Sequence, residues 1–261
     1  MRHLLYAVVG VVVLALGAVV VAQPLIGAAL HPVPTVSAFP DGAVSQSPSP
    51  VPASPSSAAT PADCRGATDP RTTAAQKKAP FTVCGVELIN KEHRVSAAYS
   101  PKLVKVAVRA YGVSSVKLQP VAAEALVRFF GDARRAGYTA VVRSSYRSYA
   151  TQKTWYATMS HTLTAPAGAS EHQSGLAVDL AGIERGRLVH GTALASSKTG
   201  AWLLKHAADY GFILRYPTSQ AKITGIAYEP WHFRYVRAQV AQGVEATKTK
   251  RNTSMFKKTL I

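Results

Sequence analysis

Two short segments, residues 170–179 (SEHQSGLAVD) and 229–232 (EPWH), restrict the fold of this 261-residue chain more than any other feature. Their imidazoles and carboxylates are His172, Asp179, Glu229 and His232. Two imidazoles and one carboxylate suit a tetrahedral zinc ion that keeps its fourth position open for water. Glu229, close to the last of these donors in sequence, is available to move protons for that water. The set predicts a zinc hydrolase.

The segment between His172 and Asp179 must fold back on itself. If it were fully extended it would span roughly 23 Å, which is far too long for two ligands of one ion. The turn can form at residues 173–175 (QSG), because Gly175 is free to adopt a positive φ angle. The next residues, 176–180 (LAVDL), alternate as in a strand and place Asp179 on the face opposite the leucine and valine side chains.

The second segment is expected to enter a strand and not a helix. Pro230 biases Glu229 away from the helical region, so Glu229 and His232 are not expected one helical turn apart. Residues 231–236 (WHFRYV) alternate as a strand, with His232 on its site-facing side. The side chains predicted on its buried face are those of Trp231, Phe233 and Tyr235. The metal is therefore expected between two neighbouring strands.

Taken singly, each of these residues has an ordinary alternative. His172 and His232 could be loop and strand histidines, and Asp179 could be a carboxylate at the end of a strand. Asp179 is flanked by Val178 and Leu180, however, and burying an unpaired carboxylate costs several kcal/mol unless a metal or a cation compensates. The complete set therefore favours a metal site.

Around these residues the chain resembles the VanY-type D-alanyl-D-alanine carboxypeptidases, which belong to the LAS group of zinc peptidases. The motifs that carry the resemblance are residues 88–91 (LINK), 144–152 (SSYRSYATQ), 170–175 (SEHQSG), 212–217 (FILRYP) and 228–235 (YEPWHFRY). They occur in the order of the family and lie between residues 85 and 240. The resemblance implies a zinc peptidase that acts on the stem peptides of peptidoglycan.

The resemblance also implies a role for individual residues. The implied ligands of Zn²⁺ are His172, Asp179 and His232. Glu229 is implied as the general base and Arg147 as the group at the scissile carbonyl. Gln152 and Ser170 are implied to hold the end of the substrate.

Arg147 and Gln152 also make physical sense without the family. An apolar run precedes Arg147, and Ser148 can cap a helix over residues 149–156. Arg147 would then lie at a strand-to-helix junction, where the helix N-terminus favours an anion or a developing oxyanion. The alternative is a surface salt bridge for Arg147 and a solvated Gln152. The other candidate cations are Arg143 and Arg215.

Residues 1–30 are predicted to be a membrane anchor or a signal segment. The uncharged residues 4–22 would span about 28 Å as a helix, close to the thickness of a bilayer core. Residues 20–22 (VVA) would also suit a cleavage site. Arg2 at the N-terminal side predicts that the catalytic part is outside the cytoplasm. We expect an uncleaved anchor, with secretion to the cell wall as the alternative.

The rest of the chain divides into three parts by composition. Residues 31–63 are rich in Pro, Ser and Ala and are predicted to be a disordered linker. Residues 64–246 form the expected zinc carboxypeptidase domain, which is long enough for one well-buried core. Residues 247–261 form a basic tail.

The two cysteines of the chain, Cys64 and Cys84, lie just before the region that contains these motifs. In an exported chain they are expected to form a disulfide around a loop of about twenty residues, which contributes on the order of 3 kcal/mol. A metal site is the alternative, but two thiols without a nearby histidine or further cysteine fall short of four ligands.

The formal net charge of +17 predicts anionic partners. The sequence contains no helix-turn-helix, zinc-finger or aromatic RNA-binding motif, and export would separate the protein from nucleic acid. Anionic cell-wall polymers or lipid headgroups are therefore the expected partners, and the protein itself is expected to be a monomer.

The predicted fold is α+β, with a small antiparallel sheet flanked by helices. Residues 120–136 have the pattern of an amphipathic helix that stops at Gly137, and a second helix is predicted from Ser196 or Ser197 to Tyr210. The family resemblance implies the same architecture, which the hedgehog signalling domain shares.

The predicted reaction is removal of the terminal D-alanine from stem peptides. The alternatives are an L,D-carboxypeptidase, an endopeptidase and a zinc-bearing binding module without turnover.

Overall fold

The computed structural model describes residues 69–73, 76–83 and 85–249. The expected membrane segment, the linker and nearly all of the basic tail lie outside these residues, as do Cys64 and Cys84. Within the described part of the chain, no helix is long and apolar enough to cross a membrane.

The central feature is an antiparallel sheet in the order β5-β6-β9-β8, with β7 paired to β6. Its strands are β5 (Thr139–Ser144), β6 (Ala177–Glu184), β7 (Arg187–Val189), β8 (Phe212–Leu214) and β9 (His232–Tyr235). Val178 and Leu180 of β6 are fully buried, as the alternation of residues 176–180 predicted. The register places Asp179 directly opposite His232. Pairing of β6 with β9 thus joins the two predicted donor segments.

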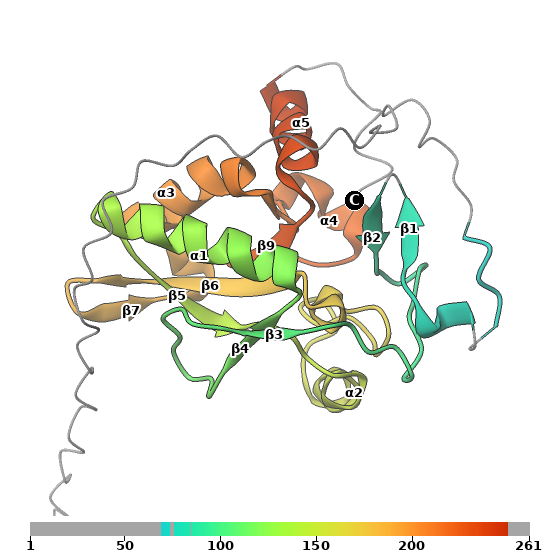
Figure 1. The fold of residues 1–261 in the computed structure, drawn as a ribbon. Coiled ribbons are helices and arrows are strands. Elements are labelled where there is room, and N and C mark those ends of the chain that lie inside the picture. Colours follow the sequence, from blue (N-terminus) through green and yellow to red (C-terminus); the bar gives the residue numbers. More distant parts are fainter. Residues whose placement is uncertain (1–68, 74–75, 84, 250–261) are drawn as a thin grey trace, which may run out of the picture. The chain divides into compact units, whose positions relative to one another are not determined.

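Two helices, α1 (Pro120–Arg135) and α3 (Lys198–His206), lie along one side of this sheet (Figure 1). Proline occupies the start of α1, where its missing N–H is not needed, and Gly137 follows the helix with a φ of +86°. Phe129 of α1 is fully buried in one cluster with Leu203 of α3 and with residues of the sheet. Burial of such a side chain contributes about 1.5–3 kcal/mol, so this core holds the sheet and both helices together.

The remaining elements surround this core. Two hairpins are formed by β1 (Phe81–Val83) with β2 (Val86–Leu88) and by β3 (Val104–Val106) with β4 (Val116–Leu118). The other helices are α2 (Tyr149–Thr158), α4 (Ala221–Thr224) and α5 (Ala238–Thr249). Short 3-10 helices cover Gln76–Lys78, Glu171–Ser174, Gly191–Ser196, Ala207–Tyr210 and Thr218–Gln220.

The helix starts follow the predicted capping residues. The Ser148 hydroxyl accepts a hydrogen bond from the Thr151 N–H at 3.2 Å at the start of α2, and Ser197 caps α3 in the same way through the Gly200 N–H. Small antiparallel sheets combined with helices confirm the predicted mixed fold for the described residues.

Candidate metal centre and catalytic site

The turn that brings the first two donors together forms at the predicted glycine. The 3-10 helix Glu171–Ser174 ends at Gly175, which has a φ of +70°. A Cβ at this position would be strained at this φ and would lie 2.5 Å from Cδ2 of Leu103, so a side chain here would also force Leu103 to move. The chain then enters β6 and reaches Asp179, opposite His232 on β9.

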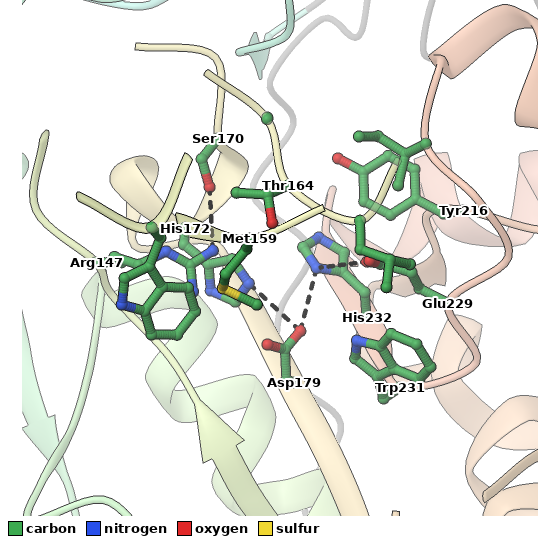
Figure 2. Close-up of a pocket in the computed structure, with 14 residues that line it drawn as sticks. Arg147, Met159, Thr164, Ser170, His172, Asp179, Tyr216, Glu229, Trp231 and His232 are labelled. Atoms are coloured by element: carbon green, nitrogen blue, oxygen red, sulfur yellow. Dashed lines mark hydrogen bonds and ion pairs between the residues drawn. The ribbon is translucent and has the colours of Figure 1, made fainter. Parts of the chain in front are cut away.

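The three predicted ligands converge on one point. Oδ1 of Asp179 lies 3.3 Å from Nε2 of His172 and 3.2 Å from Nδ1 of His232. One donor atom from each residue lies within 4.8 Å of the other two. The two imidazole rings are 4.9 Å apart and nearly perpendicular, with the carboxylate between them (Figure 2).

The hydrogen bonds around these residues leave three lone pairs facing one another. Nδ1 of His172 donates to the Ser145 carbonyl at 2.7 Å, so its Nε2 carries a lone pair. Nε2 of His232 lies 3.4 Å from the Glu171 carboxylate, to which it donates, so its Nδ1 carries a lone pair. Oδ1 of Asp179 is buried without a hydrogen-bond partner. A cation is the group that satisfies all three atoms, and second partners of this kind are typical of metal-binding histidines.

The pKa shifts of His232 and Asp179 also favour a bound cation. Burial alone would lower the pKa of His232, but the adjacent carboxylates of Asp179 and Glu171 outweigh it and raise that pKa to about 9. Burial also disfavours ionisation of Asp179, yet the two histidines hold the pKa of this carboxyl well below its usual range. The cluster is therefore strongly polarised toward binding a positive charge, and a metal ion competes for that position with a proton on His232.

Glu229 lies on the loop before β9, beside the metal donors. Its Oε2 is 3.8 Å from Nδ1 of His232, and its carbonyl accepts the His232 N–H at 3.2 Å, which forms a tight turn and not a helix. Burial raises the pKa of Glu229 to about 7. A carboxylate with a pKa near neutrality can both accept and return a proton, which is the property that a general base needs.

Arg147 lies on the opposite side of the donor cluster, at the junction of β5 and α2 (Figure 2). Its Nη2 is 3.4 Å from the hydroxyl of Ser170, and both residues line the pocket. The backbone N–H of Arg147 donates to the His172 carbonyl, which ties the loop to the first metal donor. Burial lowers the pKa of Arg147, but a guanidinium remains charged in proteins. The structure thus places a cation across the site from Glu229.

Gln152 does not line the pocket, whereas Ser170 does. Its side chain is fully buried and is absent from the residues that line the pocket. Oε1 accepts from Nε of Arg147 at 2.6 Å, and Nε2 donates to the Ala165 carbonyl at 2.6 Å. Both ends of its amide are used within the protein, so Gln152 supports Arg147 and, unlike Ser170, does not line the cavity.

A cavity of about 160 Å³ opens above the donors. Its apolar walls include Trp155, Met159, Leu163, Tyr216, Ile226 and Trp231. Trp231 lies in the turn just before β9, where it lines this cavity. The prediction that it faces the buried side of the strand is therefore wrong, because the strand and its alternation begin one residue later. Phe233 and Tyr235 do pack on the core as predicted.

Glu171 is a functional candidate that the sequence did not single out. It is buried beneath the donors, where its Oε1 accepts from Nε of Arg215 at 2.7 Å and lies 3.5 Å from Nη1 of Arg234. Burial opposes its ionisation, but these two arginines and His232 hold the pKa of Glu171 well below its usual range. The sequence could have indicated Glu171, because it is a carboxylate between Ser170 and His172 in a segment that was predicted to approach the metal.

The two other candidate cations have partners elsewhere. Arg215 forms an ion pair with Glu171 and lies over the ring of Tyr216, and it does not itself line the pocket above the metal donors. Arg143 lies over the ring of Tyr111, with its guanidinium carbon 5.4 Å from the ring centroid. Arg147 is therefore the cation that the fold places at the catalytic pocket.

Comparison with known proteins places this architecture in one family. The family model described as VanY, D-alanyl-D-alanine carboxypeptidase, matches residues 115–238, which contain all the predicted site residues. The bifunctional D-Ala-D-Ala dipeptidase and D-Ala-D-Ala carboxypeptidase VanXYC of Enterococcus gallinarum is 36% identical over 176 residues, covering 62% of this chain and 89% of that protein. The chain belongs to the VanY family of D-alanyl-D-alanine carboxypeptidases, as the sequence motifs predicted.

Two solved structures are similar to this chain. The LD-carboxypeptidase LdcB is 31% identical, with a TM-score of 0.57, and the match covers 66% of this chain and 91% of that one. A mutant of the D,D-pentapeptidase VanY from a VanB-type resistance cassette, in complex with Zn(II), is 27% identical, with a TM-score of 0.50, and the match covers 61% and 92%. The donor set of this chain fits the same ion, which supports the predicted Zn²⁺.

The family match does not extend over the whole of every relative. The match spans 62% of a Bacillus subtilis relative that is 32% identical, and 41% of the Enterococcus faecium D-alanyl-D-alanine carboxypeptidase, which is 35% identical.

Proposed function

We propose that this protein is a zinc-dependent D,D-carboxypeptidase that removes the terminal D-alanine from peptidoglycan stem peptides. The observation that carries the proposal is the convergence of three lone-pair donors between a buried base and a cation. His172, Asp179 and His232 supply the donors, Glu229 lies on one side and Arg147 on the other. The relatives described above support the choice of substrate, because two of them are named for activity toward D-Ala-D-Ala ends.

The residues around the cavity can each perform one part of a hydrolysis. Bound zinc would supply a polarised carbonyl and a water of lowered pKa. Glu229 accepts the proton of the attacking water and returns it to the leaving amine, for which its pKa of about 7 is well suited. Arg147 donates to the oxyanion that develops on the carbonyl. No acyl-enzyme is needed, so β-lactams are expected to inhibit poorly.

Ser170 and Arg147 together suit a substrate that ends in a free carboxylate. Both are polar groups at the pocket, and Ser170 lies two residues before the metal donor His172. A carboxylate with hydrogen-bond partners is much less costly to bury there than an unpaired amide. This arrangement favours a carboxypeptidase over an endopeptidase.

An L,D-carboxypeptidase is the second candidate. The observation that favours it is the similarity to LdcB, whose TM-score of 0.57 exceeds the 0.50 of the VanY structure. The two activities need the same metal, base and cation, and they differ in the residue before the scissile bond.

A binding module without turnover is the more distant candidate. Glu229 argues against it, because the side chain is buried and burial raises its pKa toward neutrality. A site that only binds a metal has no need for such a base beside its ligands. A protein in which Glu229→Gln leaves every biochemical and cellular effect intact would be a binding module.

Incubation with tripeptide, tetrapeptide and pentapeptide stem fragments separates these candidates. We expect mass spectrometry to show loss of one D-alanine from the pentapeptide, and loss of that activity after dialysis against a chelator. Zinc add-back should restore it. Faster release from the tetrapeptide would support the L,D assignment, and full activity of the metal-free protein would contradict zinc chemistry.

We also propose that the protein works outside the cytoplasm, held at the membrane by residues 1–30 or released to the cell wall. The uncharged residues 4–22, the Pro-rich linker and the nature of the substrate support this location. The net charge of +17 supports contact with anionic wall polymers or lipid headgroups.

A further inference from the structure

Trp155 on α2 is unusual for a large aromatic residue, because 38% of its surface is exposed while it also covers a buried charge. The guanidinium carbon of Arg147 lies 4.1 Å from the centroid of its ring. Trp155 also lines the catalytic cavity. It therefore contacts both the proposed oxyanion-binding cation and the space that a substrate would occupy.

The other partners of Arg147 are neutral and leave its outer donors weakly used. Nε donates to Gln152 at 2.6 Å, whereas Nη1 and Nη2 reach the hydroxyls of Ser144 and Ser170 only at 3.4 Å, near the limit for a hydrogen bond. Among the described residues, no carboxylate lies within ion-pair distance of Arg147. Its charge is therefore available to a substrate, and its position depends on neutral contacts.

The face of the guanidinium is the part that the hydrogen bonds do not restrain. Nε and the two Nη atoms lie in one plane, so the bonds to Gln152 and the serines resist movement within that plane. Stacking on Trp155 resists movement out of the plane and keeps water from that face. A cation over an aromatic ring is attracted to it, and more strongly where water is excluded.

We infer that Trp155 is a positioning residue that holds Arg147 for the terminal carboxylate of the substrate. It thereby sets the preference for a free C-terminus. This inference rests on the proposed carboxypeptidase function, and it adds a residue outside the metal and base machinery. Trp155 acts through Arg147, so its removal should change which substrate ends are accepted and not only the overall rate.

Met159 and Leu163 provide a matched control. They line the same cavity and are 45% exposed each, but neither has an aromatic ring to stack on the guanidinium of Arg147. If the wall only supplied apolar surface, truncating any of these residues should weaken all substrates alike.

The experiment compares Trp155→Leu, Trp155→Phe and Met159→Ala in the zinc-loaded protein. Each is assayed for kcat and KM on a pentapeptide stem with a free C-terminal carboxylate and on the same peptide as an amide. Trp155→Leu should lower kcat/KM for the free acid by about tenfold, with the amide changed by less than about twofold. Trp155→Phe should restore most of the loss, because it keeps an aromatic face. Met159→Ala should affect both peptides equally. Equal losses on the two peptides in Trp155→Leu would overturn the inference.

A measurement without substrate separates this inference from the proposed function. The Nε–H resonance of Arg147, assigned by its absence in Arg147→Lys, should be displaced by the ring current of Trp155. It should move in Trp155→Leu and much less in Trp155→Phe. If the wild-type protein hydrolyses neither peptide, the proposed function fails, while the resonance still decides the inference. A resonance that does not move in Trp155→Leu would overturn the positioning role whatever the activity.

Discussion

The two sides of the catalytic pocket are built in opposite ways. On the sheet side, buried charges neutralise one another: Glu171 joins Arg215 and Arg234 and also contacts the ring of His232. On the α2 side, Arg147 is held by neutral groups, and the wall above it is made of partly exposed apolar side chains. The sheet side can therefore hold metal donors rigidly, whereas the α2 side keeps a charge free for the substrate.

This difference assigns separable tasks to the two sides. Changes on the sheet side should alter metal binding and stability, because each buried charge there depends on the others. Changes on the α2 side should alter substrate preference and leave the metal in place. Glu229, on the loop before β9 and across the metal donors from Arg147, should affect turnover alone.

The largest expected effect is that of Glu229→Gln. Removing the general base while keeping the shape of the side chain should lower kcat by about 10²- to 10⁴-fold. Zinc content, measured by elemental analysis, should remain that of the wild type. An active Glu229→Gln protein would mean that another group accepts the proton.

Asp179→Ala should reduce zinc affinity by at least about a hundredfold, because it removes a ligand and not only a supporting contact. Competition with a chromophoric chelator measures the affinity. Asp209→Ala, which changes an exposed carboxylate on the protein surface, is the control. Unchanged zinc affinity in Asp179→Ala would show that this carboxylate is not a ligand.

Glu171→Gln should weaken both zinc binding and the fold. We expect zinc affinity to fall by about tenfold to a hundredfold, because His232 loses its charged partner. The free energy of unfolding should fall by about 3–5 kcal/mol, since Arg215 and Arg234 remain buried without their counterion. Chelator competition and denaturant unfolding measure the two effects.

The control for Glu171→Gln is Glu184→Gln. Glu184 lies on β6, the strand that also carries Asp179. Glu184 accepts the Thr199 N–H far from the metal donors, so its loss should leave zinc affinity unchanged. If Glu171→Gln and Glu184→Gln behaved alike, the buried network would have no specific role at the metal.

Ser170→Ala should give the smallest effect, and it should be confined to the α2 side. Loss of one hydrogen-bond donor to a carboxylate should lower kcat/KM for the free-acid peptide by about tenfold, with a smaller change for the amide. Zinc affinity should be unchanged. A loss of zinc in Ser170→Ala would show that the two sides are coupled and that the comparison between them fails.

Local sequence patterns predicted the parts of this site that depend on short-range physics. The turn at Gly175, the strand alternation around Asp179, and the helix cap at Ser148 each follow from a few neighbouring residues. The three metal donors were predicted differently, from their residue types together with the resemblance to the VanY-type carboxypeptidases, because His232 lies in a separate segment that only strand pairing brings to Asp179. Trp231 was placed wrongly because the tight turn at Pro230 extends one residue further than alternation alone could indicate.

The sequence by itself predicted the candidate donor set, the candidate base, the antiparallel strands that carry them and membership of the VanY family. Only the tertiary structure decided which residues support that set. Glu171 meets Arg215 across 44 positions and His232 across 61, and no local pattern encodes such partners. In the same way, Gln152 bonds to Arg147 and does not line the cavity, because the Ala165 carbonyl occupies the other end of its amide. Periodicity and turns act over a few residues, whereas buried charges and hydrogen bonds are satisfied by whatever distant groups the packed core brings within reach.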